Sequence, residues 1–408
     1  MTKYGLLLIV GYLFINTASF AQSEIDNLKR IVAQQKGDTI EIRALMKLGT
    51  HYSGEDISLS FRYFRKALVL AEKNKTKTSH INILNDLGGL YHKQGNYDSS
   101  LYFHRQALRE ATSAENSFHR ADTYHLMGLT FLRMVNYDSA RTNLAKGLAI
   151  ATEKNYYTLQ SDIYVVWGNT FLEEGNDAEA LKKFIMAAKL QDSLIHDPEG
   201  ESRALLNIAN IQYKMGEMDK AIAYAREAQP LAEKAKFDRG LAYASQLLGR
   251  IYRKQKKFDE SLTEYNKALA VYKRVGDNRS MAETLQNIGN SLFDKGSIQE
   301  AGNYYYDALK IVRRTGNPTL FTYNYSSIGY FHYSLKQYDL AIVYMDSSRV
   351  YAENTNDQYS VLDAYELLTL IKEKQGAYKS ALEYHRKAPD QRREQDWCCQ
   401  TGDGVSKW

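Results

Sequence analysis

The sequence contains few of the residues that interrupt helices or cross-link a chain. Among its 408 residues there are 4 prolines and 2 cysteines. Proline breaks the interior of a helix, so its scarcity permits long helices. Cys398 and Cys399 are adjacent, an arrangement that strains disulfide geometry. The rest of the chain therefore has no disulfide framework and no thiolate site.

Long runs of one charge sign are also missing. The 53 basic and 48 acidic side chains are interspersed, and the net charge is +5. Proteins that bind nucleic acids concentrate Lys and Arg on one face or in one segment. The mixed pattern predicts an ordinary solvated surface and no nucleic-acid partner.

Signatures of catalysis and of cofactor binding are missing as well. The 9 histidines are scattered, and none forms a pair with metal-ligand spacing and an acidic neighbour. The chain has no glycine-rich phosphate loop and no nucleophile elbow. We therefore expect no cofactor, no metal site and no enzymatic activity.

Residues 1–21 have the features of a secretory signal peptide. Lys3 supplies the positive charge, residues 6–15 are mostly apolar, and Ser19 and Ala21 place small side chains before a cleavage point. The alternative is an uncleaved anchor, which the short apolar run disfavours because a span needs about 20 residues. We expect cleavage after Ala21, export to the periplasm or beyond, and no stable membrane insertion of the mature chain.

The rest of the sequence is periodic. Small residues recur about every forty residues. The first series is Gly49, Gly88, Gly128, Gly168, Ala209, Gly249, Gly289, Gly329 and Thr369. Two further small-residue series keep step with it. Helices approach closely only where side chains are short, so each unit predicts a pair of helices that pack against each other, and no segment has a strand pattern.

The turns repeat in the same register. Gly95 and Gly175 follow the expected end of a first helix, where glycine terminates helices readily. Asp98 and Asp138 follow such turns, which predicts that they cap the second helices. Pro230 falls inside an expected second helix and predicts a kink or an early end there.

These motifs resemble tetratricopeptide repeats. Leu87–Tyr91 carries the pattern Leu-Gly-x-x-Tyr, and Gly168, Phe184 and Ala187 continue it in a later unit. The family's usual unit has about 34 residues, so forty implies longer helices. The resemblance implies an all-α, right-handed α-solenoid of about nine helical hairpins over residues 38–388.

The segments at either end of the array differ from it. Residues 22–37 are expected to form a capping helix on the first hairpin. Residues 389–408 contain both cysteines and two of the three tryptophans, without helical periodicity. This tail is either a real extension or out-of-frame sequence, and the two interpretations remain open.

The resemblance also implies where a partner binds. In such arrays the first helices line a concave groove that takes peptides or helices of partner proteins. By register, the predicted partner-binding residues are Asn85, His125, Asn169, Arg203, Asn210, Tyr213, Arg250, Arg253, Asn290, Tyr323, Tyr330 and Tyr333.

Three groups within this set have distinct chemistry. The asparagines can grip a peptide backbone, because an amide both donates and accepts hydrogen bonds. The arginines can bind an acidic segment or a carboxylate, and the tyrosines can form a binding hot spot. For each group, the alternative is a structural role in repeat packing or on a solvated surface.

The sequence therefore predicts an exported scaffold that binds proteins or peptides. The alternative is the periplasmic sensor region of a signal-transducing histidine kinase or transcription regulator, truncated before its membrane span. The family resemblance implies the same binding groove for both.

Overall fold

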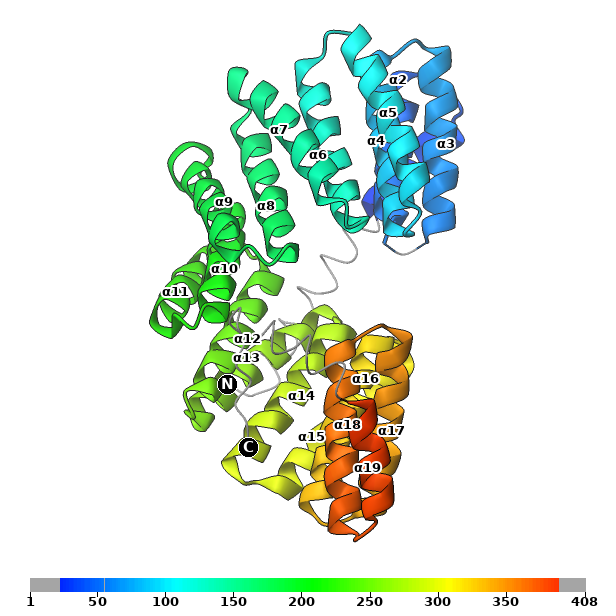
Figure 1. Cartoon of the computed structure of the whole chain (residues 1–408). Coiled ribbons are helices and arrows are strands. Elements are labelled where there is room, and N and C mark those ends of the chain that lie inside the picture. The colour runs from blue at the N-terminus through cyan, green and yellow to red at the C-terminus, as the bar shows by residue number, and fades with distance from the viewer. Residues whose placement is uncertain (1–22, 55, 389–408) are drawn as a thin grey trace, which may run out of the picture. The chain divides into compact units, whose positions relative to one another are not determined.

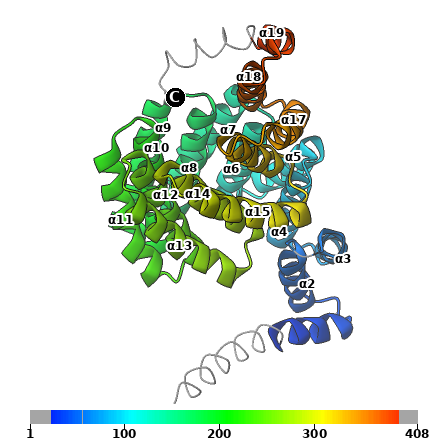
Figure 2. The ribbon, with the colours of Figure 1, turned by 90° about the horizontal axis from the view of Figure 1, so that it is seen from below.

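The computed structural model describes residues 23–54 and 56–388, and everything described there is helix or connecting turn. The predicted leader and tail lie outside these residues, so both stay predictions. A first helix covers residues 23–33. It packs against α2 (Thr39–Tyr52) through a cluster in which Ile25 and Leu28 contact Ala44 and Leu48. Figure 2 shows this helix lying against α2.

The chain divides into two compact units between Ile195 and His196. In the N-terminal unit four helix pairs follow one another along the chain (Figure 1). They are α2 with α3 (Ile57–Lys73), α4 (Lys77–Lys93) with α5 (Tyr97–Ser113), α6 (Ser117–Arg133) with α7 (Tyr137–Glu153), and α8 (Tyr157–Glu173) with α9 (Asp177–Leu190). A π-helical turn, η1 (Gln191–Ile195), extends α9.

The C-terminal unit contains five pairs. They are α10 (Pro198–Lys214) with α11 (Met218–Lys234), α12 (Asp238–Lys254) with α13 (Phe258–Val275), α14 (Asn278–Lys295) with α15 (Ile298–Thr315), α16 (Pro318–Ser334) with α17 (Tyr338–Asn354), and α18 (Gln358–Lys374) with α19 (Tyr378–Lys387). The prediction of an all-α fold built from about nine hairpins is confirmed.

The glycines of the first helices explain why the hairpins close. A Cβ placed on Gly88 would lie 2.6 Å from the His104 ring, and one on Gly249 would lie 2.8 Å from the ring of Tyr265. In both hairpins the large residue comes sixteen positions after the glycine and lies on the second helix. The same pairing recurs at Gly128–Leu144, Gly168–Phe184 and Gly289–Tyr305. Each glycine therefore makes room for one large side chain of its hairpin partner.

The second helices begin earlier than the sequence predicted. Asn96 and Asn136 are the N-cap residues of α5 and α7, and each side chain accepts a hydrogen bond from the backbone three residues on. Asp98 and Asp138 lie inside the first turn, so the prediction that they cap these helices is wrong. Their charge still favours the helix start, where the helix dipole is positive.

The predicted early end of a helix at Pro230 is also wrong. α11 continues through Pro230 to Lys234. Ala228 and Ala232, on either side of it, are completely or almost completely buried, whereas Pro230 faces solvent. Packing of the buried face therefore holds the helix together across the hydrogen bond that proline cannot make.

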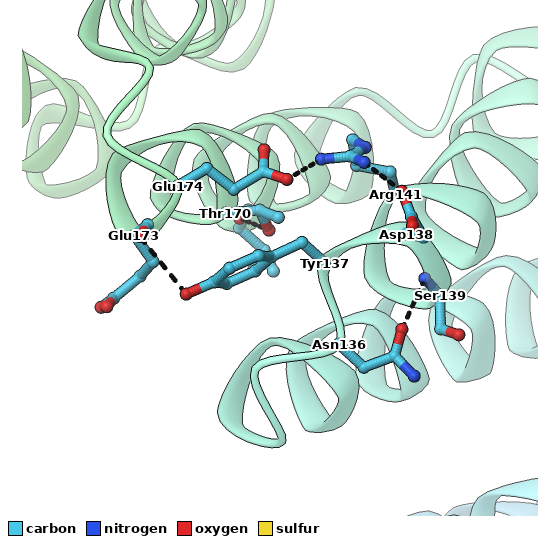
Figure 3. Close-up of polar contacts among 9 residues, drawn as sticks. Asn136, Tyr137, Asp138, Ser139, Arg141, Thr170, Glu173 and Glu174 are labelled. Carbon is cyan, nitrogen blue, oxygen red and sulfur yellow. Dashed lines mark hydrogen bonds and ion pairs between the residues drawn. The ribbon is translucent and has the colours of Figure 1, made fainter.

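Polar contacts join neighbouring hairpins at their ends. Figure 3 shows the third and fourth hairpins, where the Tyr137 hydroxyl donates to the Glu173 carbonyl at 3.3 Å. Arg141 of α7 forms ion pairs with Glu174, just after α8, and with Asp138 of its own helix. Because these contacts link residues more than thirty positions apart, they tie one hairpin to the next.

Candidate binding face of the first helices

In the C-terminal unit, two arginines of α12 make separate polar contacts with the first helices on either side, and we call these residues the Arg250 cluster: Asn210, Tyr213, Arg250, Arg253 and Asp294. Arg250 of α12 donates from Nη2 to Asn210 Oδ1 of α10 at 3.2 Å. Its guanidinium also lies over the Tyr213 ring, 5.3 Å from the centroid. One arginine thus contacts two residues of the preceding hairpin.

Arg253 connects the cluster to the following hairpin. Its Nε donates to Asp294 Oδ2 of α14 at 2.6 Å, and both side chains are about one-third exposed or less. The two arginines therefore differ in charge balance. Arg253 is paired with a carboxylate, whereas Arg250 has no ion pair within the described residues and its buried Nε has no hydrogen-bond partner there.

Tyr265 packs against Gly249, the residue before Arg250 in α12. Tyr265, on α13, is fully buried, and its hydroxyl has no hydrogen-bond partner among the described residues. Burial raises the pKa of the phenol well above its usual value, and Arg253 and Arg250 act against that shift. Sequence reasoning missed Tyr265 because second helices were taken as packing elements. Its position sixteen residues after Gly249 could have drawn attention to it.

The asparagines of the predicted set do not form one free row. Asn210 accepts from Arg250, and Asn290 accepts from the Tyr305 hydroxyl at 2.9 Å. Asn169 is half-buried on α8, in the N-terminal unit. Asn85 is buried, donates to Thr123 at 3.0 Å and contacts the His104 ring, so its amide is used inside the array.

The remaining predicted residues are distributed over both units. Arg203 is half-exposed, forms an ion pair with Glu199 at 2.5 Å and lies over the ring of Phe237. His125, on α6, lies 3.8 Å from Asp122 and is mostly covered. Neither residue contacts the Arg250 cluster through a hydrogen bond or ion pair of the described chain.

The three tyrosines of α16 have unequal environments. The Tyr330 hydroxyl donates to Asp363 of α18 at 2.6 Å, and Tyr333 packs against Tyr338 with ring centroids 6.0 Å apart. Only Tyr323 is substantially exposed, at 44%. Tyr330 and Tyr333 thus take part in repeat packing, and Tyr323 alone offers an open aromatic face.

The N-terminal unit holds two buried groups with opposite pKa shifts. Burial lowers the pKa of His104 to about 4, and burial together with the nearby Asp122 raises that of Asp86 to about 7. Neutral His104 therefore contributes stability that is present above pH 6.5, its ordinary pKa, and that is lost as the pH falls toward 4.

The sign is reversed for Asp86. Its folded state binds the proton more tightly than the unfolded chain, whose carboxyl has its ordinary pKa of 3.8. The free-energy cost of an ionised Asp86 in the folded state therefore disappears as the pH falls below about 7. Through this group, the folded state becomes more stable at lower pH. Over the range between these values, the two groups change the free energy of unfolding in opposite directions.

The described residues also bear on metal binding and on membrane insertion. No group of three or more His, Cys, Asp or Glu side chains there is arranged to hold a metal ion. None of the helices described has the length and apolar character needed to cross a membrane.

Comparison with protein families agrees with the repeated helix pairs of the structure. Models of the tetratricopeptide repeat match residues 79–153, 202–234 and 241–317. These segments carry tetratricopeptide repeats. The last two matches cover α11, most of α12 and the whole of α13, α14 and α15, and so include Arg250, Arg253 and Tyr265. No curated protein matched the chain.

Solved structures show the same fold at low sequence identity. A signal-transduction ATPase with a tetratricopeptide-repeat sensor from Pyrococcus horikoshii is 16% identical, with a TM-score of 0.61 over 84% of this chain and 55% of that one. This chain thus spans about half of that protein. The apo quorum sensor NprR from B. thuringiensis is 13% identical, with a TM-score of 0.61 over 92% and 99% of the two chains.

A Rap protein complexed with Competence and Sporulation Factor is also similar. It is 14% identical, with a TM-score of 0.52 over 77% of this chain and 98% of that one. At these identities the likeness concerns the fold. This chain therefore shares its fold with these solved proteins.

Proposed function

We propose that this chain is an exported, non-enzymatic scaffold whose first helices bind segments of partner proteins. The observation that carries the proposal is the Arg250 cluster. It joins three successive first helices, α10, α12 and α14, and it presents an arginine without an ion pair among the described residues. Arginine and tyrosine together are typical of binding hot spots.

Fold analogy supports the same role. The similar solved structures include a Rap protein in complex with a factor and a quorum sensor. Such likeness is an argument by analogy, since one fold hosts many functions. The chemistry of Arg250, Tyr213 and Asn210 provides the independent argument.

The test is selection of displayed random peptides on the mature chain. We expect enriched peptides whose affinity falls by about tenfold or more in Arg250→Glu, because a charge-assisted contact is replaced by repulsion. Arg313→Glu is the matched control, since Arg313 is exposed on the second helix α15 of the same unit and receives the same charge change. If no peptide is enriched, or if both variants bind equally, this face is not the binding surface.

The sensory role is the second candidate, favoured by the two sensors among the similar structures. It shares the binding face and differs in what binding accomplishes. Small-angle scattering with and without a selected peptide separates the two roles. A sensor is expected to change its radius of gyration on binding, whereas a passive scaffold keeps it.

Export rests on the leader pattern. Mass spectrometry of protein recovered from the exported fraction should show an N-terminus at Gln22, the product of cleavage after Ala21. An intact Met1 on protein recovered from inside the cell would refute both cleavage and export.

A further inference from the structure

The first observation concerns two equivalent tyrosines in successive hairpins. Tyr265 and Tyr305 are forty residues apart, and their rings pack against Gly249 and Gly289 in the same way. The Tyr305 hydroxyl donates to Asn290 at 2.9 Å. The Tyr265 hydroxyl has no partner within the described part of the chain. The hairpins thus share their packing but differ in how this hydroxyl is satisfied.

The reason is the residue opposite each hydroxyl. Asn290 and Arg250 occupy equivalent positions, forty residues apart on α14 and α12. An amide oxygen accepts a hydrogen bond, whereas a guanidinium only donates. Arg250 therefore cannot accept a hydrogen bond of the kind that Asn290 accepts in the next hairpin. The buried Nε of Arg250 is also without an acceptor among the described residues.

Two buried donors that lack acceptors indicate a missing acceptor. The Tyr265 ring packs on Gly249, the residue before Arg250 in α12, and the equivalent Tyr305 hydroxyl reaches the residue after Gly289. The same packing therefore directs the Tyr265 hydroxyl toward Arg250. Arg253 is already paired with Asp294 at 2.6 Å, whereas Arg250 has no ion pair among the described residues and Lys254 adds a second positive charge over the Tyr213 ring. One monovalent anion with two acceptor oxygens matches both the charge and the donors.

We propose that Tyr265 and Arg250 form a subsite for one carboxylate of the protein segment that the first helices bind. Tyr265 donates through its hydroxyl and Arg250 through Nε, one hydrogen bond to each carboxylate oxygen. Binding requires the part-exposed Arg250 side chain to turn away from its 3.2 Å hydrogen bond to Asn210, because the Tyr265 hydroxyl is otherwise buried. The role of this carboxylate in recognition rests on the proposed function, whereas the donor pair itself does not.

Acetate is the probe for the donor pair. Titration of the full mature chain, labelled with ¹³C at tyrosine Cζ, should shift the Tyr265 signal saturably, with the signal assigned from Tyr265→Phe. The shift should disappear in Arg250→Gln and should not occur with chloride at equal ionic strength. An unmoved signal, or an equal response to chloride, overturns the subsite.

Selected peptides test its role in recognition. Tyr265→Phe should weaken their binding about tenfold or more, the loss expected for one hydrogen bond to a charged group. Tyr305→Phe, the matched control, should leave affinity unchanged because its hydroxyl is bonded to Asn290. Replacing Asp or Glu by Asn or Gln in the peptide, or amidating its C-terminus, shows which carboxylate is bound.

The outcomes separate the two proposals. Peptides that bind wild type and Tyr265→Phe equally overturn the subsite but leave the scaffold proposal standing. A response to acetate without any peptide binder supports the donor pair and refutes peptide binding. Because the Tyr265 hydroxyl has no partner among the described residues, Tyr265→Phe should keep the thermal unfolding midpoint of wild type, which confirms that any loss of binding is local.

Discussion

Two adjacent glycines of α4 provide a direct test of how the hairpins close. A Cβ on Gly88 would lie 2.6 Å from His104 Cε1, a separation at which one of the two must move. A Cβ on Gly89 would meet nothing within 4 Å. Gly88→Ala and Gly89→Ala are therefore the same chemical change, made one residue apart in the same helix, with and without a steric conflict.

The expected magnitudes follow from three contributions. Alanine is favoured over glycine inside a helix by about 1 kcal/mol, and Gly89→Ala should gain most of that. Gly88→Ala gains it too, but overpacking costs about 1–3 kcal/mol. Displacing His104 also weakens its 3.1 Å contact with Asn85, worth about 1 kcal/mol. We expect the two variants to differ by roughly 3 kcal/mol, with Gly88→Ala the less stable.

Native-state hydrogen exchange is the suitable assay, because a long repeat array need not unfold in two states. Amides of α4 and α5 should exchange faster in Gly88→Ala and slower in Gly89→Ala than in wild type, while those of α18 stay unchanged in both. Equal protection in the two variants would refute the claim that the glycine series exists to seat the second-helix side chains.

Two further predictions concern the N-terminal unit. Val135 has a φ of 57°, a left-handed conformation that is unfavourable for a side chain with a branched Cβ. Val135→Gly should therefore stabilise the protein by about 1 kcal/mol in urea unfolding. An unchanged midpoint would contradict this. His104→Phe removes one of two opposing titrations, so the variant should gain about 2 kcal/mol of stability from pH 7 to pH 5 through Asp86. Wild type should change little, Asp86→Asn should lose about as much, and parallel pH profiles would refute the reasoning.

Much of the fold could be predicted because the same pattern of small and large residues recurs in each of the nine repeats. The spacing of the small residues indicated the helix pairs, and the structure places large side chains over those glycines. The caps were predicted two residues late. Asp98 and Asp138 lie near the start of α5 and α7, where an aspartate is favourable both as the N-cap and in the first turn. Only the side-chain geometry of Asn96 and Asn136 distinguishes the two.

Less of the candidate site could be predicted. Register placed Arg250, Arg253, Asn210 and Tyr213 on one side of the first helices. The structure brings Arg250 into contact with Asn210 and Tyr213, whereas Arg253 pairs with Asp294. Register could not show that Tyr330 is bonded to Asp363, because the partner of a side chain depends on which rotamers neighbouring hairpins leave open. Register also did not indicate Tyr265, because the role of its hydroxyl depends on Arg250, which takes the place of the asparagine found in the next hairpin.

The positions where the repeats agree and the positions where they differ therefore have different roles. The glycine that seats a large side chain recurs from hairpin to hairpin, because every hairpin must close in the same way. One position later in the same helices the residue varies, as Gly89, Asn169, Arg250 and Tyr330 show. Closure does not require one residue type at that position, so its chemistry differs between hairpins: Asn290 and Tyr330 bond within the array, whereas Arg250 leaves its Nε without a partner among the described residues. Arg250 in place of an asparagine leaves donors without acceptors, which packing alone does not explain.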